Sequence, residues 1–171
     1  MPRATRNYIL GFDAVPCCPG YRKDISTAMH EASHAAAALL LGIVPREMSI
    51  ALDGSVRVLP LFYPAETLLS EQQRATYQVA GIVGEWLTGC VETDPERYRG
   101  DFHRVRRIAL DCSLDEDQQS AFYLSACAGA EALLLDHWPG VLALANELMG
   151  RRSLDEADIR QVFKEAITCM P

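Results

Sequence analysis

An alanine-rich, apolar stretch near the start of this 171-residue chain is interrupted by two histidines and a glutamate. Residues 30–34 read His-Glu-Ala-Ser-His, and the apolar run 35–41 follows them directly. Helix-forming residues dominate the surroundings, so we expect a helix over residues 24–41 that Asp24 caps and Gly42 ends. Three ionisable side chains on a buried helix are costly unless a partner compensates them. The fold must therefore bring such a partner to this helix.

His30 and His34 are four residues apart, about one helical turn, and so project from the same face. Both imidazoles can then bind one metal ion, and neutral imidazole is a preferred ligand of zinc. Glu31 follows the first histidine directly, which places its carboxylate beside the metal as the general base for an attacking water. We therefore predict Zn²⁺ as the cofactor, His30 and His34 as its ligands and Glu31 as the catalytic residue. The alternative is a pair of hydrogen-bonded core histidines beside a surface glutamate.

The composition is typical of one globular and mainly helical domain, since 49% of the residues are hydrophobic and 8% are aromatic. We expect residues 1–22 to form a loosely ordered leader and residues 23–171 to form the domain. The net charge of −7 argues against a nucleic-acid partner. One local basic cluster, formed by Arg104, Arg106 and Arg107, contrasts with this acidic balance.

No segment is apolar over the length that a membrane requires, because the longest apolar run, residues 35–44, covers about half of a bilayer core. The N-terminus lacks the apolar core of a signal peptide. We therefore expect a cytoplasmic protein without a membrane partner, whose six cysteines are reduced thiols. The vicinal Cys17 and Cys18 either bind a metal or lie in the leader, and the lack of a second Cys/His pair favours the leader.

Turn and capping signals predict a mainly α fold with one small β hairpin. Asp53-Gly54 is a strong hairpin signal between strand candidates at residues 47–52 and 55–59, and Pro60 ends the second strand. Three capping boxes, which begin at serines, and two other start signals then predict five further helices. These run from Ser70 to Gly89, from Asp101 to Cys112, from Ser113 to Leu135, from Pro139 to Gly150 and from Ser153 to Ala166.

A catalytic zinc site usually has three protein ligands, so a third ligand must come from elsewhere in the chain. Asp101 shares a helix face with Val105 and Ile108 and therefore points toward the core. Gly100-Asp101 fits a helix N-cap equally well, and the pattern alone does not choose between cap and ligand. His103 points the other way, with the basic cluster. The further candidates are His137, Glu85, Glu66 and Asp94.

Four segments resemble the peptidase domain of the FtsH family, the membrane-anchored ATP-dependent zinc proteases. The first is H-E-A-S-H-A at residues 30–35, where the family has H-E-A-G-H-A. Three later segments are similar, in the same order, to the family's G-R-A-A-E-E-L helix, its S-N-D-L-x-x-A-T-x-I-A segment and its closing T-L-x-x-x-E-I helix. These are residues 80–87, 100–109 and 152–159. The resemblance covers nearly the whole chain beyond the leader, and it implies that Asp101 is the third zinc ligand.

The resemblance also implies six-fold rings that admit unfolded chains, but the sequence departs from the family in three respects. Ser33 replaces the family's glycine, which tightens the packing behind the metal. The hairpin region is shorter, and the sequence has neither a G-x-x-x-x-G-K-[ST] phosphate loop nor a membrane anchor. We therefore expect self-association, most readily as a hexamer, with any ATP-driven unfolding supplied by a separate ATPase partner.

Two further assignments concern the surroundings of the metal. Glu85 matches a family glutamate, and it either accepts a hydrogen bond from a ligand histidine or is a solvated helix residue. The strand around Met48-Ser49-Ile50 is expected to accept an extended peptide by edge pairing, which orients the scissile carbonyl at the zinc.

These expectations combine into a stand-alone zinc metalloendopeptidase of the FtsH peptidase type that cuts unfolded or accessible protein segments. Two alternatives stay open. One is a regulatory metallopeptidase of the ImmA type that cuts a single partner. The other is a non-catalytic binding or assembly module that keeps the metal for structure. The intact Glu31 argues against this second alternative, because a structural zinc needs no base.

Overall fold

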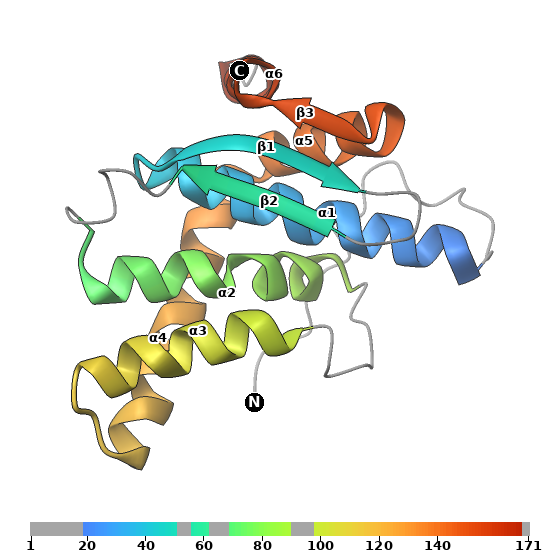
Figure 1. The fold of residues 1–171 in the computed structure, drawn as a ribbon. Coiled ribbons are helices and arrows are strands. Elements are labelled where there is room, and N and C mark those ends of the chain that lie inside the picture. Colours follow the sequence, from blue (N-terminus) through green and yellow to red (C-terminus); the bar gives the residue numbers. More distant parts are fainter. Residues whose placement is uncertain (1–18, 51–55, 62–68, 90–97, 169–171) are drawn as a thin grey trace.

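Six helices and a small sheet make up the part of the chain that the computed structural model describes, residues 19–50, 56–61, 69–89 and 98–168. The helices are α1 (Pro19–Leu40), α2 (Glu71–Thr88), α3 (Arg99–Asp111), α4 (Glu116–Leu135), α5 (Trp138–Arg151) and α6 (Glu156–Thr168). The strands are β1 (Val44–Ile50), β2 (Val56–Leu61) and β3 (Ser153–Asp155). The prediction of a mainly α fold with one small antiparallel hairpin is confirmed (Figure 1).

Helix α1 extends further toward the N-terminus than predicted. It begins at Pro19, so residues 19–22 are helical, whereas residues 1–18, with the vicinal cysteines, lie outside the described part of the chain. The prediction that Asp24 caps the helix is wrong, because Asp24 lies inside it. Its carboxylate instead accepts a hydrogen bond from the guanidinium of Arg152, at 3.1 Å. This ion pair joins the helix to the start of β3.

Three of the predicted capping residues act where the sequence places them. Helix α1 ends at Leu40, and Gly42 adopts a φ of 77°, the left-handed conformation that favours glycine. Helix α2 begins with a reciprocal capping box in which the Ser70 hydroxyl accepts from the Gln73 N–H and the Gln73 side chain accepts from the Ser70 N–H. It ends at Gly89, which is also left-handed. These ends depend on local chemistry alone.

Two capping boxes start two residues later than predicted. The cap of α4 is Asp115, which accepts from the Gln118 N–H at 2.9 Å, while Ser113 belongs to the turn that closes α3. The cap of α6 is Asp155, which accepts from the Asp158 N–H at 2.9 Å. In both cases an aspartate replaces the predicted serine, and the preceding residues are already used by another element.

The sheet has a third strand that was not predicted. Strand β1 lies between β2 and β3 and is antiparallel to both. Residues 153–155 form β3, in which Leu154 is fully buried between two exposed residues and pairs with Met48. An apolar side chain between two polar ones is the alternation of a half-buried strand. This pairing connects the C-terminal part of the chain to the hairpin.

Strand β2 continues to Leu61, so the prediction that Pro60 ends it is wrong. Pro60 is opposite Pro45 in the ladder, beside an irregularity between Pro45 and Glu47. Proline lacks an N–H to donate and is tolerated in an edge strand or beside a bulge. The predicted turn at Asp53-Gly54 lies outside the described residues.

Helix α1 lies at the centre of the fold, between α2 on one side and the sheet and α5 on the other (Figure 1). Small residues allow α1 and α2 to approach closely: Ala32 and Ala35 are fully buried, and a Cβ at Gly84 would overlap the Ser33 hydroxyl. The Ser33 hydroxyl donates to the Met29 carbonyl at 2.7 Å and fills this space. The helix with the two histidines is therefore held rigidly from several sides.

Two side chains near helix ends are exposed, namely Trp86 and Cys112. Both lie at the C-terminal ends of their helices, where packing against a neighbouring helix ends. Cys112 and Cys127 are free thiols in the described part of the chain. Among the described helices, none combines the length and apolar character that crossing a membrane requires.

Candidate metal centre

His30, His34 and Asp101 bring three potential ligand atoms together inside the protein. The Nε2 atoms of the two histidines are 3.2 Å apart, one turn from each other on α1. Asp101 reaches them from α3, with its Oδ2 atom 3.2 Å from His30 Nε2 and 3.5 Å from His34 Nε2. All three residues are buried, with 6–8% of their surface exposed. This is the only such group of three or more potential ligands among the described residues.

The other ring nitrogens fix the tautomers of the two histidines. His34 Nδ1 lies 3.0 Å from the carbonyl oxygen of Tyr77, and because a carbonyl only accepts, Nδ1 must carry the proton. His30 Nδ1 lies 2.7 Å from a carboxylate oxygen of Glu85 and donates to it in the same way. In the neutral rings, both Nε2 atoms therefore present lone pairs toward Asp101. Two lone pairs and a carboxylate oxygen converge on one small volume.

The charges at this centre favour a bound cation. Burial lowers the pKa of His30, but hydrogen bonds to Asp101 and Glu85 outweigh it and raise the pKa to about 9. Burial raises the pKa of Asp101, but hydrogen bonds to His30 and His34 outweigh it and hold that pKa well below its ordinary value. Without a metal, a proton on His30 supplies the positive charge that stabilises the carboxylates of Asp101 and Glu85. The donor set fits zinc, which prefers nitrogen and carboxylate ligands in this number.

Asp101 is not a helix cap, so that alternative is wrong. The N-cap of α3 is Tyr98, and Asp101 lies inside the first turn of the helix. Its Oδ1 atom accepts a hydrogen bond from the Arg104 guanidinium at 3.1 Å, which leaves Oδ2 directed at the histidines. The position within α3 therefore agrees with the ligand role that the resemblance implies.

The remaining candidates for the third ligand do not join the centre. His103 is exposed on the opposite face of α3, as predicted. His137 precedes α5 and donates from Nδ1 to the Leu133 carbonyl at 3.1 Å. Glu66 and Asp94 lie outside the described residues.

Glu85 is fully buried, so the alternative of a solvated helix residue is wrong. Its carboxylate accepts hydrogen bonds from the Ser26 hydroxyl at 2.5 Å, from His30 Nδ1 at 2.7 Å and from the Tyr98 hydroxyl at 2.9 Å. The Tyr98 ring also stacks on His30, with a centroid distance of 6.1 Å. A carboxylate that holds the outer nitrogen of a ligand histidine fixes the orientation of the ring and increases its basicity.

Sequence reasoning missed four groups around the site: the Ser26 hydroxyl, the Tyr77 carbonyl, the Tyr98 hydroxyl and the Arg104 guanidinium. Helical spacing contains part of this signal, because Ser26 precedes His30 by four residues and Tyr98 precedes Asp101 by three. The Tyr77 carbonyl could not be found in this way, since a backbone group carries no residue-type signal.

Glu31 is buried next to His30 but does not belong to the group of three converging ligands. Its negative charge contributes to the raised pKa of His30. A carboxylate that is close to the ligand atoms without being a ligand can accept a proton in a reaction at the metal.

Gly81 provides the space in which the ligand atoms meet. A Cβ at this position would lie 2.6 Å from His30 Nε2 and 2.6 Å from His34 Nε2. Real Cβ atoms essentially never approach other atoms so closely. Glycine is therefore required here for access to the two nitrogens.

The prediction that Met48-Ser49-Ile50 offers a free sheet edge is wrong. Met48 and Ser49 pair with β2 on one side and with β3 on the other, and the Ile50 N–H donates to the Arg152 carbonyl at 2.9 Å. The short β3 could not be foreseen because its pairing connects residues about a hundred positions apart. In the described sheet, β2 and β3 are the edge strands.

Comparison with protein-family models and with curated proteins found no match for this chain. The geometry of the centre therefore carries the functional argument.

The raised pKa of His30 predicts that zinc uptake depends on pH. Near pH 7.5 the metal must displace the His30 proton, so binding releases about one proton, and zinc affinity rises by up to about tenfold per pH unit toward pH 9. In the metal-free protein, the raised pKa of His30 contributes to the stability of the folded state. This contribution is complete below pH 6.5 and is lost as the pH approaches 9. Calorimetry in buffers of different ionisation enthalpy counts the protons. Affinity that does not change with pH would contradict the prediction.

Glu85→Gln is expected to lower zinc affinity by about 10- to 100-fold while the protein stays folded, because the charge that holds His30 Nδ1 is lost. Competition with a chelating dye measures the affinity, and circular dichroism measures the helix content. Glu147→Gln, an exposed change on α5, serves as the matched control. Equal affinities of the two variants would show that Glu85 does not support the metal site.

Proposed function

We propose that this chain is a zinc metalloendopeptidase that acts in the cytoplasm. The observation that carries the proposal is the convergence of His30 Nε2, His34 Nε2 and Asp101 Oδ2 beside the non-ligand Glu31. A bound zinc ion supplies a Lewis acid that polarises a carbonyl and lowers the pKa of water. A purely structural site needs four protein ligands and no adjacent base, whereas the described residues offer three ligands and a base here.

Other residues around the centre transfer the proton and orient the ligands. Glu31 takes the proton from the attacking water and passes it to the departing amine, which is general acid–base catalysis by one carboxylate. Glu85 and Tyr98 keep the His30 ring oriented, and the Tyr77 carbonyl keeps His34 oriented. Burial of the centre limits competing water and strengthens these interactions.

An FtsH-type peptidase arrangement is supported by where three of the four resembling segments lie. Residues 30–35 carry the two histidines and Glu31, residues 80–87 carry Gly81 and Glu85, and residues 100–109 carry Asp101. Segments that are distant in sequence thus meet at one centre, which supports the ligand role that the resemblance implies for Asp101.

The substrate is proposed to be an unfolded or accessible peptide segment that pairs with β2 rather than with β1. Strand β2 is an edge strand in the described sheet, and it contacts α1, which carries the histidines. Edge pairing binds the backbone of any extended chain, so it suits substrates of varied sequence. A folded domain offers no such extended segment.

Metal analysis combined with a cleavage assay tests the proposal. Protein purified without chelators should hold about one zinc ion per chain.

Asp101→Asn should weaken zinc binding strongly with unchanged helix content, because the anionic oxygen is lost while the fold around α3 is kept. The zinc-loaded protein should cleave an unstructured protein. Zinc binding without cleavage of any peptide would favour the non-catalytic module, and cleavage confined to one partner would favour the ImmA-type regulatory peptidase.

We expect the protein to self-associate, with a hexamer as the preferred closed ring, because the resembling peptidases form six-fold rings. Cyclic symmetry would place equivalent sites around one chamber and restrict entry to unfolded chains. Light scattering coupled to size exclusion, over a range of concentrations and with or without a candidate ATPase partner, measures the assembly. A monomer at every concentration would contradict this expectation and favour the single-substrate peptidase.

A further inference from the structure

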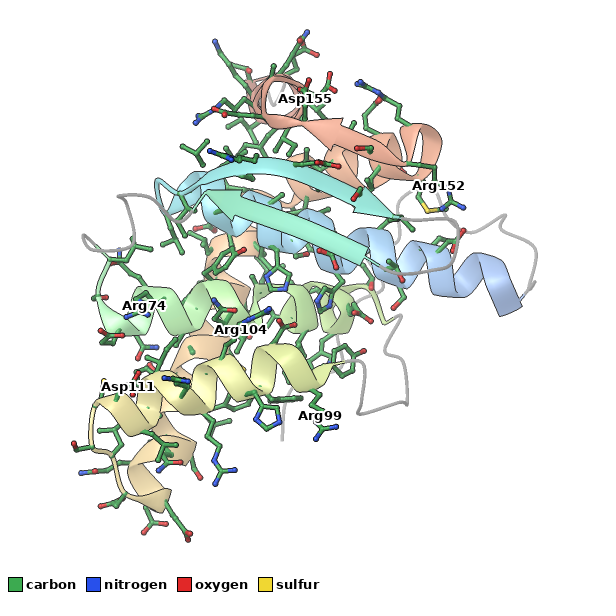
Figure 2. All side chains as sticks on the ribbon, viewed as in Figure 1. Arg74, Arg99, Arg104, Asp111, Arg152 and Asp155 are labelled. Carbon is green, nitrogen blue, oxygen red and sulfur yellow. The ribbon has the colours of Figure 1, made fainter. Side chains whose placement is uncertain are left out.

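A cavity of about 270 Å³ lies between α2 and α3, next to the candidate metal centre. Its apolar wall includes Leu69 and Ile108. Its polar lining includes three arginines: Arg74 from α2, and Arg104 and Arg107 from α3. Figure 2 shows Arg74 and Arg104 on the two helices that border the cavity. Two of these arginines belong to the basic cluster that the metal centre leaves unexplained.

Arginines outnumber acidic side chains among the described residues that line the cavity, although the chain as a whole is acidic. Among the described residues that line it, Asp111 is acidic and three are arginines. Arg74 is engaged by Glu71 at 2.9 Å, and Arg104 uses one guanidinium nitrogen on Asp101. Arg107 is exposed, and no ion pair to it is formed by the described residues. A guanidinium that forms no ion pair and lies next to an apolar wall suits a carboxylate on an otherwise apolar segment.

Two residues connect the cavity directly to the metal centre. Tyr77 lines the cavity, and its carbonyl accepts from His34 Nδ1. Arg104 lines the cavity, and its guanidinium donates to Asp101 Oδ1. A ligand in the cavity would therefore lie beside the metal centre.

Helix geometry gives the distance between the two places. Asp101 and Arg107 are six residues apart on α3, which corresponds to roughly 9 Å along the helix. An extended peptide advances about 3.3 Å per residue. A side chain in the cavity thus belongs to a residue two or three positions from the bond at the metal.

We infer that the arginine-lined cavity is a specificity pocket that binds a carboxylate of the peptide substrate, two or three residues from the scissile bond. This inference rests on the proposed peptidase function. The carboxylate belongs to a Glu or Asp side chain, or to the C-terminus of a short peptide. The overall charge of −7 makes a nucleic acid the less favoured occupant.

Equilibrium binding tests the pocket without requiring turnover. The probes are fluorescein-labelled ten-residue peptides of Ser, Ala and Leu with one central Glu, Gln or Lys, each with a free or an amidated C-terminus. The protein is the zinc-loaded Glu31→Gln variant. We expect the Glu peptide to bind about tenfold more tightly than the Gln peptide, the effect of one charge-assisted hydrogen bond. The preference should weaken as salt increases.

Variants on α3 then locate the binding site. Arg107→Gln should abolish the preference for Glu, and Arg107→Glu should reverse it in favour of Lys. Arg106→Glu is the matched control, since it is an exposed neighbour that does not line the cavity. Circular dichroism and zinc content confirm that each variant is folded. If tighter binding depended on a free C-terminus rather than on the central Glu, the pocket would bind terminal carboxylates.

Three results would overturn the inference. The first is that the amidated Glu and Gln peptides bind equally and that free-acid and amidated peptides also bind equally. The second is a preference for the Glu peptide that Arg107→Glu leaves intact, and the third is a single-stranded oligonucleotide that binds more tightly than the peptides and is lost in Arg107→Glu. Cleavage assays with active protein distinguish failure of the proposed pocket from failure of the proposed peptidase function. Cleavage without any preference for acidic peptides would refute the pocket alone. Absence of cleavage with intact carboxylate binding would refute the peptidase alone.

Discussion

Glu31→Gln is expected to lower the rate of peptide-bond cleavage by about 100-fold or more, the usual contribution of a general base. The amide has nearly the same shape as the carboxylate but cannot accept a proton from water. Glu31 is not one of the three converging ligands, so the variant should still bind about one zinc ion per chain. Cleavage of a fluorescent unstructured protein and elemental analysis measure the two properties on the same sample.

Glu131→Gln provides the control, because this residue is exposed on α4 and the substitution has the same chemistry. It should retain both zinc and the rate of cleavage. If Glu31→Gln cleaved as fast as this control, Glu31 would not be the base. Loss of zinc from Glu31→Gln would instead indicate that Glu31 helps to bind the metal.

Gly81→Ala is expected to lower zinc affinity by about 100-fold or more, a larger loss than removal of a supporting hydrogen bond causes. The added Cβ would lie 2.6 Å from both Nε2 atoms, so the two histidines must move away from each other or from Asp101. Overpacking of this kind also costs about 1–3 kcal/mol of folding free energy. Dye competition for zinc and chemical denaturation of the metal-free protein measure the two effects.

Gly150→Ala is the matched control for this substitution. Gly150 is also helical, but a Cβ there meets no atom within 4 Å. Alanine is the better helix former by about 1 kcal/mol, so Gly150→Ala should leave zinc binding unchanged and stabilise the protein slightly. Equal zinc affinity of Gly81→Ala and Gly150→Ala would mean that the ligand atoms do not meet at Gly81.

The components of the site that depend on one helix were predictable from sequence. His30 and His34 share a face because residues four apart do so in any α-helix, and Glu31 follows from the same spacing. The C-terminal end of α1 and both ends of α2 were also predictable, since Gly42, Ser70 and Gly89 act through their own backbone and side-chain geometry. Such signals need no information from the rest of the fold.

Several features could not be predicted because they depend on which elements pack together. The N-terminal end of α1 differs from the prediction because Asp24 lies inside the helix. The caps of α4 and α6 differ because Ser113 belongs to the turn after α3 and Ser153 to β3. The third strand formed because burial of Leu154 and pairing with Met48 outweighed a local helix-start signal. That pairing removed the free edge that the sequence suggested at β1.

For this protein, the sequence by itself determined the helical class, the small hairpin and the spacing of His30, Glu31 and His34, because these depend on local periodicity and capping. Tertiary structure decided the rest of the centre: Asp101 as a converging group rather than a cap, Glu85 as a buried acceptor rather than a solvated residue, and Gly81 as the space between them. These residues lie 47 to 71 positions from His30 or His34 in the sequence. Only close packing of α1 against α2, and of α2 against α3, brings them together, and that packing depends on burial and shape, which no local pattern specifies.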